Sequence, residues 1–264
     1  MSDSADGQSR LLAGRRVVVT RAAAQAADLA EALRRFGAEV IACPVLRAEP
    51  APATHLAPLR DRLATYDWLV FTSENGVRGL RSQLAALGLD VGALGAPRVA
   101  AVGEATAEAV AGAGLSVDFV PGEFRAEVLV RELLAAHDLR DKCLLRVRGG
   151  RASTEVEDTL REAGVEVDVL DSYRTLPAAP DPAVRRDILG RGADAVCFAS
   201  GSAVDGFERA VAEHGLHDRA VAACNGPLCA RAAERTGWRR ILVARASSAE
   251  ALAEALAREL DGAR

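Results

Sequence analysis

Two halves of this chain repeat one another, and the repeat constrains the fold more than any other feature of the sequence. Residues 15–48 align without a gap on residues 142–175 at an offset of 127, so that Arg21 meets Arg148. The offset holds through the next strand and then becomes 123 after a loss of four residues. The small residues that match in order are Gly37 with Gly164, Ser73 with Ser200, Gly79 with Gly206 and Gly103 with Gly226. Ordered matches of this kind indicate a duplication and not a chance similarity of Ala-rich helices.

Both copies alternate short apolar runs with Ala-rich amphipathic stretches. Strict alternation of strands and helices predicts parallel sheets covered by helices on both faces. The predicted strands are 16–20, 39–46, 68–72, 98–102, 117–120, 142–147, 167–175, 195–199, 220–224 and 240–244. The predicted helices are 23–36, 54–65, 75–87, 104–112, 124–136, 152–163, 181–189, 202–213, 227–236 and 248–260. Five strands in each copy suit a small flavodoxin-like sheet, so we expect an α/β fold of two flavodoxin-like parallel-sheet domains that arose from an internal duplication.

Proline-rich segments follow Leu46 and Thr175, which are nearly equivalent places in the two copies. If both segments link domains, the first βα unit belongs with the last third of the chain. The expected layout is a discontinuous first α/β domain of residues 1–40 and 178–264, an inserted second α/β domain of residues 52–166, and a two-stranded β hinge of residues 41–51 and 167–177. This layout predicts a cleft between two facing sets of strand carboxyl ends.

Composition excludes several classes of function. The formal net charge of −4, with no basic helix or tail, argues against binding to nucleic acid. No apolar run approaches the length that spans a membrane, and Met1–Arg10 is small and polar with no apolar stretch of an export signal after it. Five cysteines are scattered without CxxC spacing, which indicates a reducing, cytoplasmic setting and no metal site.

The carboxyl ends of the predicted strands carry small residues and hydroxyls, where helix N-termini present unpaired N–H groups to ligands. At any single turn, helix capping is the simpler explanation. Six converging turns, two of them with arginine, favour an anion-binding cleft. The candidate binding residues at these turns are Thr20, Arg21, Thr72, Ser73, Asn75, Gly103, Thr106, Arg148, Gly149, Ser200, Gly201, Ser202, Gly226 and Pro227. No P-loop is present and no GxGxxG motif follows the first strand, so a nucleotide site is not indicated.

The usual catalytic groups are absent from these turns. The four histidines, His55, His137, His214 and His217, lie on predicted helices or loops away from the strand ends. No catalytic triad or metal cluster can be assembled from the sequence. An enzyme of this kind would have to act chiefly by positioning its substrate.

Several motifs, in this order and spacing, resemble the uroporphyrinogen-III synthase family over residues 14–260. They are Phe71-Thr72-Ser73, Val102-Gly103-Glu104-Ala105-Thr106-Ala107, Gly164-Val165-Glu166-Val167, Tyr173-Arg174-Thr175, Phe198-Ala199-Ser200 and Gly226-Pro227. The resemblance implies two domains joined by a two-stranded hinge. It also implies a cofactor-free lyase reaction, in which hydroxymethylbilane, a linear tetrapyrrole with eight carboxylates, is cyclised with inversion of ring D and loss of water. The product would serve haem, sirohaem or corrin synthesis, and we expect a monomer.

The resemblance points to Tyr173 as the residue that assists departure of the ring A hydroxyl, and to Thr106 as a cleft residue. The position that matches Tyr173 in the first copy is Leu46, so the two hinge strands differ there by a phenol. A purely structural role, as an amphipathic strand residue with its hydroxyl in water, is the alternative for Tyr173.

The chain departs from the family at Leu228-Cys229, where the family usually has threonine. This departure leaves a second hypothesis, a non-catalytic paralogue that binds a tetrapyrrole or another polyanion as a regulatory module. We expect no DNA-binding extension of the kind that some relatives carry, because the sequence ends at Arg264, and this favours the enzyme.

Overall fold

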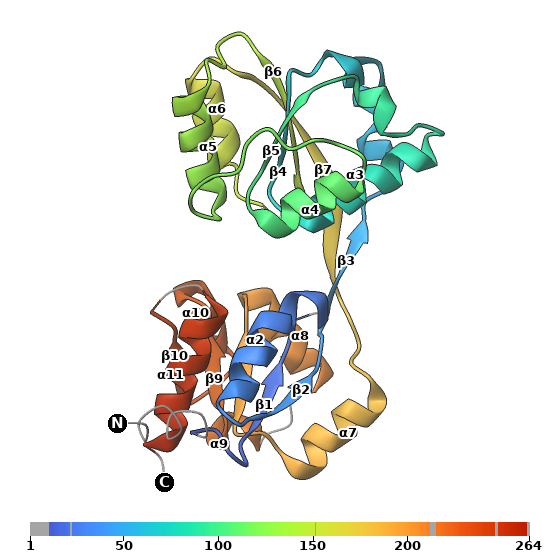
Figure 1. The fold of residues 1–264 in the computed structure, drawn as a ribbon. Helices are drawn as coiled ribbons and strands as arrows, with labels where there is room; N and C mark the ends of the chain where they lie inside the picture. Colours follow the sequence, from blue (N-terminus) through green and yellow to red (C-terminus); the bar gives the residue numbers. More distant parts are fainter. Residues whose placement is uncertain (1–10, 22, 151, 212–214, 246–247, 263–264) are drawn as a thin grey trace. The chain divides into compact units, whose positions relative to one another are not determined.

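The computed structural model describes residues 11–262 of the chain, apart from residues 22, 151, 212–214 and 246–247 (Figure 1). The chain divides into two compact units, of which unit 1 is Met1–Arg47 with Leu176–Arg264 and unit 2 is Ala48–Thr175. The domain limits expected from the sequence fall inside these units. The expectation about residues 1–10 lies outside the described residues. Among the described residues, no helix combines the length and apolar character that crossing a membrane requires.

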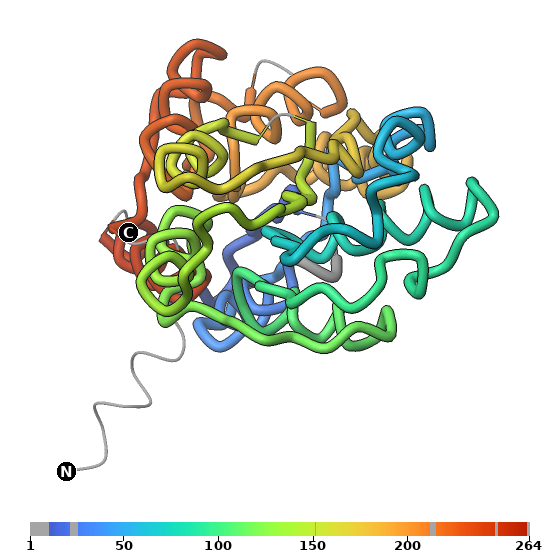
Figure 2. Tube along the Cα trace, turned by 90° about the horizontal axis from the view of Figure 1, so that it is seen from above, coloured from blue at the N-terminus to red at the C-terminus, as the bar shows by residue number. Residues whose placement is uncertain are grey.

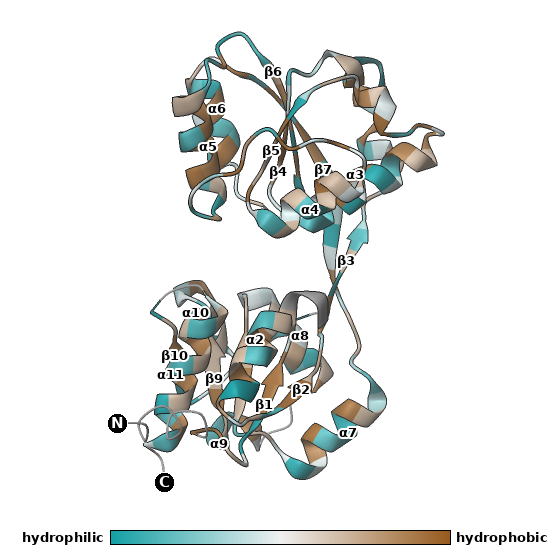
Figure 3. Cartoon of the chain, viewed as in Figure 1, coloured by the Kyte–Doolittle hydropathy of each residue, from teal (hydrophilic) through white to brown (hydrophobic). Residues whose placement is uncertain are grey.

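Unit 1 contains a five-stranded sheet in the order β10-β9-β8-β1-β2, and its neighbouring strands pair in parallel. Its strands are β1 (Arg16–Val19), β2 (Glu39–Ala42), β8 (Ala195–Phe198), β9 (Val221–Cys224) and β10 (Arg240–Val243). The three central strands β1, β8 and β9 are buried along their whole length, as expected for strands covered on both faces. The strand residues are mostly brown in the hydropathy colouring, whereas the helices carry both brown and teal residues (Figure 3).

Helices cover both faces of the unit 1 sheet (Figure 1). The helices of this unit are α2 (Ala23–Arg35), α7 (Pro182–Arg191), α8 (Gly201–Ala210), α9 (Leu216–Arg219), α10 (Pro227–Arg235) and α11 (Ala249–Asp261). One core contains Leu33 of α2 with Leu256 of α11. The opposite core contains Phe207 of α8 with Ala233 of α10. Burial of each large apolar side chain stabilises the unit by roughly 1.5–3 kcal/mol.

Unit 2 contains a second five-stranded sheet, in the order β3-β7-β6-β4-β5. Its strands are β3 (Leu46–Pro50), β4 (Trp68–Phe71), β5 (Arg98–Ala101), β6 (Cys143–Gly149) and β7 (Glu166–Pro177). Strands β4, β5, β6 and β7 pair in parallel. The strands that the sequence repeat matches occupy equivalent places, since β7-β6-β4-β5 corresponds to β2-β1-β8-β9 of unit 1. The two segments expected to pair as a hinge contain β3 and β7, which are neighbours at one edge of this sheet.

The helices of unit 2 also lie on both faces of its sheet. They are η1 (Ala53–His55), η2 (Ala57–Thr65), α3 (Glu74–Ala86), η3 (Val91–Leu94), α4 (Glu104–Gly112), α5 (Ala126–Ala136) and α6 (Glu155–Glu162), where η marks a 3₁₀ helix. Leu80 and Val110 place α3 and α4 in one core, and Leu129 and Leu160 place α5 and α6 in the other. Helices α5 and α6 lie side by side in both views (Figures 1 and 2).

Three predicted elements differ from the structure, each for a local reason. The predicted strand 39–46 is broken before β3, because Pro44 in its middle lacks a backbone N–H for a sheet ladder. The predicted helix 54–65 forms the 3₁₀ helices η1 and η2, since Pro58 cannot donate the i→i−4 bond of a continuous α-helix.

The third difference is the predicted strand 117–120, which is reduced to one isolated bridge between Phe119 and Ala100. The Asp118 carboxylate accepts a hydrogen bond from the Val99 N–H at 2.8 Å. The Val99 N–H is thus bonded to a side-chain oxygen and not to the carbonyl oxygen that a regular strand pair would supply. Pro121, which has no N–H, follows the predicted strand directly.

One packing detail recurs in both units. A Cβ atom added to Gly79 of α3 would lie 2.2 Å from the Ser172 carbonyl oxygen of β7. A Cβ atom added to Gly206 of α8 would lie 3.1 Å from the Val45 carbonyl oxygen. The repeat matches Gly79 with Gly206 and Ser172 with Val45. In each unit, glycine therefore lets a helix pack closely against the segment that precedes the point where the chain passes into the other unit.

Candidate functional site

Tyr173 lies at the carboxyl-end rim of the unit 2 sheet, where β6 and β7 end their regular pairing. The register shifts between Arg148 and Gly149, and the shift brings Gly149 opposite Tyr173. The aromatic ring lies against the Gly149 backbone, because a Cβ atom added there would be 2.7 Å from Tyr173 Cζ. The Gly150 N–H also donates to the Tyr173 carbonyl oxygen at 3.1 Å. Tyr173, whose ring is half-buried, therefore has a defined position against the backbone of Gly149 and Gly150.

The Tyr173 phenol is linked by hydrogen bonds to the start of α3. Ser73 is the N-cap residue of this helix, and its Oγ accepts from the Gly76 N–H at 3.1 Å. The same Oγ donates to the Tyr173 hydroxyl oxygen at 3.3 Å. Because the phenol oxygen accepts this bond, the phenol proton is left to donate to a ligand. Two turns that are far apart in the sequence, at Ser73 and Gly149, are thus brought together at the catalytic candidate.

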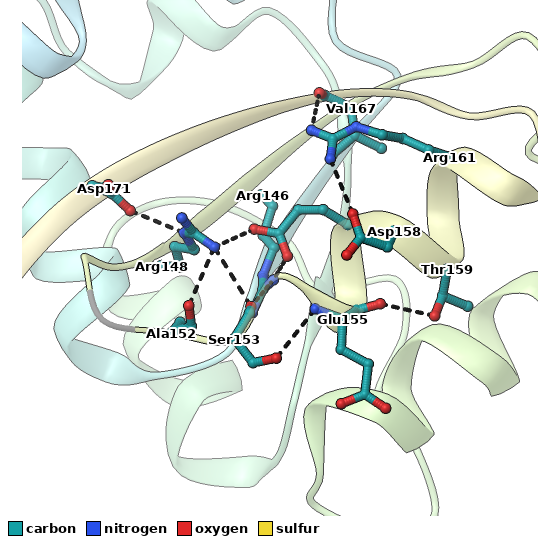
Figure 4. Close-up of polar contacts among 11 residues, drawn as sticks. Arg146, Arg148, Ala152, Ser153, Glu155, Asp158, Thr159, Arg161, Val167 and Asp171 are labelled. Carbon is teal, nitrogen blue, oxygen red and sulfur yellow. Dashed lines mark hydrogen bonds and ion pairs between the residues drawn. The ribbon is translucent and has the colours of Figure 1, made fainter.

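Arg148, predicted to bind an anion, is engaged by protein groups (Figure 4). Its Nε donates to Asp171 Oδ1 at 2.9 Å and its Nη1 donates to Glu157 Oε1 at 2.6 Å. Glu157 is buried and also forms an ion pair with the buried Arg146. Burial, and then the Arg148 charge beside it, lower the pKa of Arg146 to about 10. Two arginines and two carboxylates thus neutralise one another, and the expectation of a free anion-binding charge at Arg148 does not agree with this geometry.

Arg21, the repeat partner of Arg148, has the opposite environment. It lines a hollow of about 330 Å³ at the carboxyl ends of β1, β8 and β9, together with Asp28, Asn225 and Ser248. Among the residues that the structure describes, no carboxylate forms an ion pair with Arg21. The surrounding atoms desolvate its guanidinium and lower the pKa of Arg21. Of the two predicted arginines, Arg21 is therefore the one that retains a charge for an incoming anion.

The hydroxyl and amide candidates mostly have structural partners. The Thr20 hydroxyl is buried and donates to the Cys197 carbonyl at 2.8 Å, which links β1 to β8. Asn75 Oδ1 accepts from Arg78 at 2.5 Å. Ser200 caps α8 by accepting from the Ala203 N–H at 3.2 Å. Gly201 and Ser202 form the first turn of that helix, and Thr72 is half-buried at the end of β4.

Gly103 and Gly226 are the N-cap residues of α4 and α10, and neither has a side-chain cap. Pro227 begins α10, as is common at the first helical position. Thr106, in the first turn of α4, is only 5% exposed. These two helices present backbone N–H groups at the rims of their sheets, in unit 2 and unit 1 respectively.

Two exposed apolar side chains lie beside these helix starts, and sequence reasoning named Leu228 but missed Phe124. Phe124 is 62% exposed and covers Gly103, since a Cβ atom added to that glycine would be 2.9 Å from Phe124 Cγ. Leu228, which follows Pro227, is 76% exposed, whereas Cys229 after it is buried. The departure from the family's threonine therefore places an apolar side chain in solvent at the start of α10. The only signal for Phe124 in the sequence was an aromatic residue in a chain with few of them.

Of the other titratable groups, His55 lies nearest to this site, because its Nδ1 is 3.0 Å from the Asp171 carbonyl oxygen of β7. His217 bonds Glu208 at 3.0 Å and packs on the Trp238 ring, and His137 packs on the Trp68 ring. The remaining prediction for a histidine, at position 214, lies outside the described residues. Within the described part of the chain, no group of three or more His, Cys, Asp or Glu residues is placed to hold a metal ion.

Helix N-termini at the carboxyl ends of parallel strands commonly bind small anionic molecules. Arg21 lines a hollow at such an end in unit 1, and Tyr173 lies beside the carboxyl end of β6 in unit 2. Residues 27–254 match the family model described as uroporphyrinogen-III synthase HemD. The chain therefore belongs to the uroporphyrinogen-III synthase family, and the resemblance noted in the sequence is confirmed.

Individual relatives agree with this assignment. A porphyrin biosynthesis protein HemD of Ruminiclostridium josui is 28% identical over 233 residues, which are 88% of this chain and 46% of the relative. A uroporphyrinogen-III synthase of Chlorobaculum parvum is 27% identical over 247 residues, which are 91% of this chain and 98% of the relative. The chain thus spans about half of the first relative and nearly all of the second. A mutant uroporphyrinogen III synthase of Thermus thermophilus has a crystal structure that superposes with a TM-score of 0.55, at 25% identity, over 94% of this chain and 99% of that one.

Proposed function

We propose that this protein is a uroporphyrinogen-III synthase, a lyase that cyclises hydroxymethylbilane with inversion of ring D and loss of water in tetrapyrrole biosynthesis. Membership of the family supports the reaction class. The observation that carries the assignment to this chain is the placement of the Tyr173 phenol. It lies beside the carboxyl end of β6, against the backbone of Gly149, and accepts a hydrogen bond from the N-cap serine of α3.

The first chemical step is the departure of the ring A hydroxyl. The C–O bond breaks, its electron pair leaves with oxygen, and the pyrrole nitrogen supplies electrons to the carbon, which gives an azafulvene cation. The leaving oxygen needs a proton to depart as water. Tyr173 is suited to donate that hydrogen bond, because Gly76 N–H, Ser73 Oγ–H and the phenol form a relay whose hydrogen bonds point the same way. The partial positive charge at the start of α3 favours the electron-rich phenol oxygen as the bond strengthens.

Substrate binding rests on the carboxylates of hydroxymethylbilane. In unit 1, Arg21 forms no ion pair with the described residues, and it faces a hollow that Ser248 at the start of α11 also lines. The Leu228 N–H after Pro227 in unit 1 and the first N–H groups after Gly103 in unit 2 offer further donors. Thr20 we assign to the structure of unit 1, because its hydroxyl already bonds Cys197. The remaining candidates that we retain as rim residues near these donors are Thr72, Asn75, Thr106, Ser200, Gly201, Ser202 and Pro227.

The finer features of the fold are proposals of the same kind. We infer two flavodoxin-like units from one duplication, joined by a hinge of the β3 and β7 segments, and a cytoplasmic monomer that needs no cofactor. The strand order supports the duplication, since repeat-matched strands occupy matched places in both sheets. The shared close approach of Gly79 to Ser172 and of Gly206 to Val45 supports it independently.

Freshly prepared hydroxymethylbilane tests the function directly. In water it closes spontaneously to the type I isomer, so the expected result is that added protein converts it to the type III isomer, separated by chromatography after oxidation. A Tyr173→Phe variant is expected to lower kcat by roughly tenfold to a hundredfold, since a positioned proton donor contributes on that order. Its thermal unfolding should match the wild type. Type I product alone in the presence of the wild-type protein refutes the proposed enzyme.

The same experiment separates a second candidate, a non-catalytic paralogue that binds a tetrapyrrole or another polyanion. The exposed Leu228 in place of a hydroxyl is the observation that favours it. This candidate predicts saturable binding of hydroxymethylbilane with type I product only. Type III product excludes it.

A further inference from the structure

Two arginines at matched places in the repeat have acquired different surroundings. Arg21 faces the hollow of unit 1 with no ion pair among the described residues, whereas Arg148 has a side chain only 14% exposed and two carboxylate partners. A guanidinium that already binds two carboxylates gains little from a third anion. Arg148 is therefore better suited to a role other than direct binding of the substrate.

The contacts of Arg148 connect three segments around Tyr173. Its Nε binds Asp171, two residues before Tyr173 in β7. Its Nη1 binds Glu157 of α6 and lies 3.4 Å from the Ala152 carbonyl oxygen in the loop between β6 and α6 (Figure 4). The planar fork of arginine holds these groups at fixed angles, which the point charge of lysine cannot do.

The segments that Arg148 connects are also those that contact or carry Tyr173. Gly149 follows Arg148 directly, and the backbone of Gly149 is the surface on which the Tyr173 ring lies. The Ser172 hydroxyl donates to the Arg148 carbonyl oxygen at 3.2 Å, and Ser172 is fully buried. Arg148 and Asp171 are the last β6–β7 pair in regular register, so their ion pair lies directly before the shift that brings Gly149 opposite Tyr173.

We propose that Arg148 is a positioning residue for Tyr173: through Asp171 and Glu157 it fixes the β6–β7 register shift, and so holds the phenol at Ser73. This inference rests on the proposed function for its catalytic consequence. Its structural part, the position of the ring in the free protein, does not require turnover.

The test is an Asp171→Asn variant of the full-length chain. This change removes the charge at a carboxylate that is 35% exposed and leaves the buried Arg148–Glu157 pair in place, so folding is expected to be retained. We expect kcat to fall by roughly tenfold, because small misplacements of a catalytic group have effects of that order, with KM within about twofold of the wild type. In the Tyr173→Phe background the same change is expected to have no further effect on kcat, since the group being positioned is gone.

A control variant and a spectroscopic readout complete the design. Asp158→Asn removes the neighbouring surface ion pair with Arg161, which contacts neither Tyr173 nor Gly149, and should leave kcat unchanged. The chain has two tyrosines, so protein labelled with 3-fluorotyrosine gives two ¹⁹F resonances, and Tyr66→Phe assigns them. We expect Asp171→Asn, and not Asp158→Asn, to shift the Tyr173 resonance in the free protein.

The outcomes separate the inference from the proposed function. If the wild-type protein makes no type III isomer but the Tyr173 resonance shifts in Asp171→Asn, the positioning role stands and the enzyme assignment fails. If the wild-type protein is active while Asp171→Asn leaves both kcat and the resonance unchanged, the positioning role is wrong. A rise in KM alone, or an equal loss of kcat in the Tyr173→Phe background, likewise overturns it.

Discussion

Replacement of Gly149 by alanine should displace the Tyr173 phenol without disturbing the rest of the fold. The new Cβ atom would lie 2.7 Å from Tyr173 Cζ and 3.0 Å from its hydroxyl oxygen. An ordinary contact begins near 3.4 Å, so the ring must move by about 0.7 Å. The hydrogen bond from Ser73 is already 3.3 Å long, so a displaced ring needs to lengthen it only slightly to break it.

The expected result is a loss of kcat of roughly tenfold, equivalent to about 1.4 kcal/mol of activation free energy. KM should change little, because the ring is displaced and no proposed substrate contact is removed. The free energy of unfolding should fall by about 1 kcal/mol or less, since the ring is half-buried and can move toward solvent. Initial rates of type III formation from hydroxymethylbilane and thermal unfolding measure the two effects.

Gly150 provides a matched control in the next position. A Cβ atom added there meets its nearest neighbour, Asp171, at 3.8 Å, which is an ordinary contact. Gly150→Ala should therefore retain kcat, although it makes the same chemical change in the same loop. Equal kcat values for the Gly149 and Gly150 variants would refute the described contact between the Tyr173 ring and the Gly149 backbone.

Two further predictions concern charge and packing. Arg21→Gln should raise KM for hydroxymethylbilane roughly tenfold or more, because the change removes one charge-assisted hydrogen bond, while kcat and thermal stability are retained. The KM of Arg21→Lys should lie between the values for Arg21→Gln and the wild type. An unchanged KM in steady-state assays would remove Arg21 from the binding site. Gly79→Ala places Cβ 2.2 Å from a backbone oxygen, whereas Gly206→Ala places it 3.1 Å from one. Gly79→Ala should therefore lower Tm by roughly 5 °C more than Gly206→Ala in a thermal melt. Equal losses of Tm would contradict the packing argument.

Much of the fold could be predicted from the sequence, because parallel strands buried on both faces are apolar runs that differ sharply from the helices between them. The predictions failed where a single residue overrode the pattern. Pro44 and Pro58 lack the N–H that a strand or an α-helix needs there, and Asp118 replaces a carbonyl as the partner of Val99. Such local competition does not alter the apolar periodicity, so the pattern alone could not reveal it.

The site was harder to predict than the fold. Ser73 and Gly149 were named from the sequence because they lie at strand ends, and Tyr173 was named from the family resemblance and from its match with Leu46 in the repeat. Their contact could not be foreseen, because it depends on the register shift after Arg148, which no residue pattern reveals. Phe124 was missed because its exposure depends on how the segment after the isolated Phe119 bridge passes over Gly103.

The different surroundings of the two arginines, in contrast, can be found in the repeat itself. Arg148 is neutralised by Glu157 and Asp171. The residues that match these two acids in the first copy are Ala30 and Pro44, which cannot pair with Arg21. The second copy also has a phenol, at position 173, where the first has leucine.

The acids that engage Arg148 and the phenol that we propose it positions thus occur in the same copy, while Arg21 of the other copy forms no ion pair with the residues that the structure describes. If Asp171 serves to position Tyr173, the Asp171→Asn variant should slow type III formation and leave Arg148 with one carboxylate partner fewer. The occurrence of acids and phenol in one copy agrees with the proposed roles, in which Arg21 of the first copy binds an anion and Tyr173 of the second copy donates the proton.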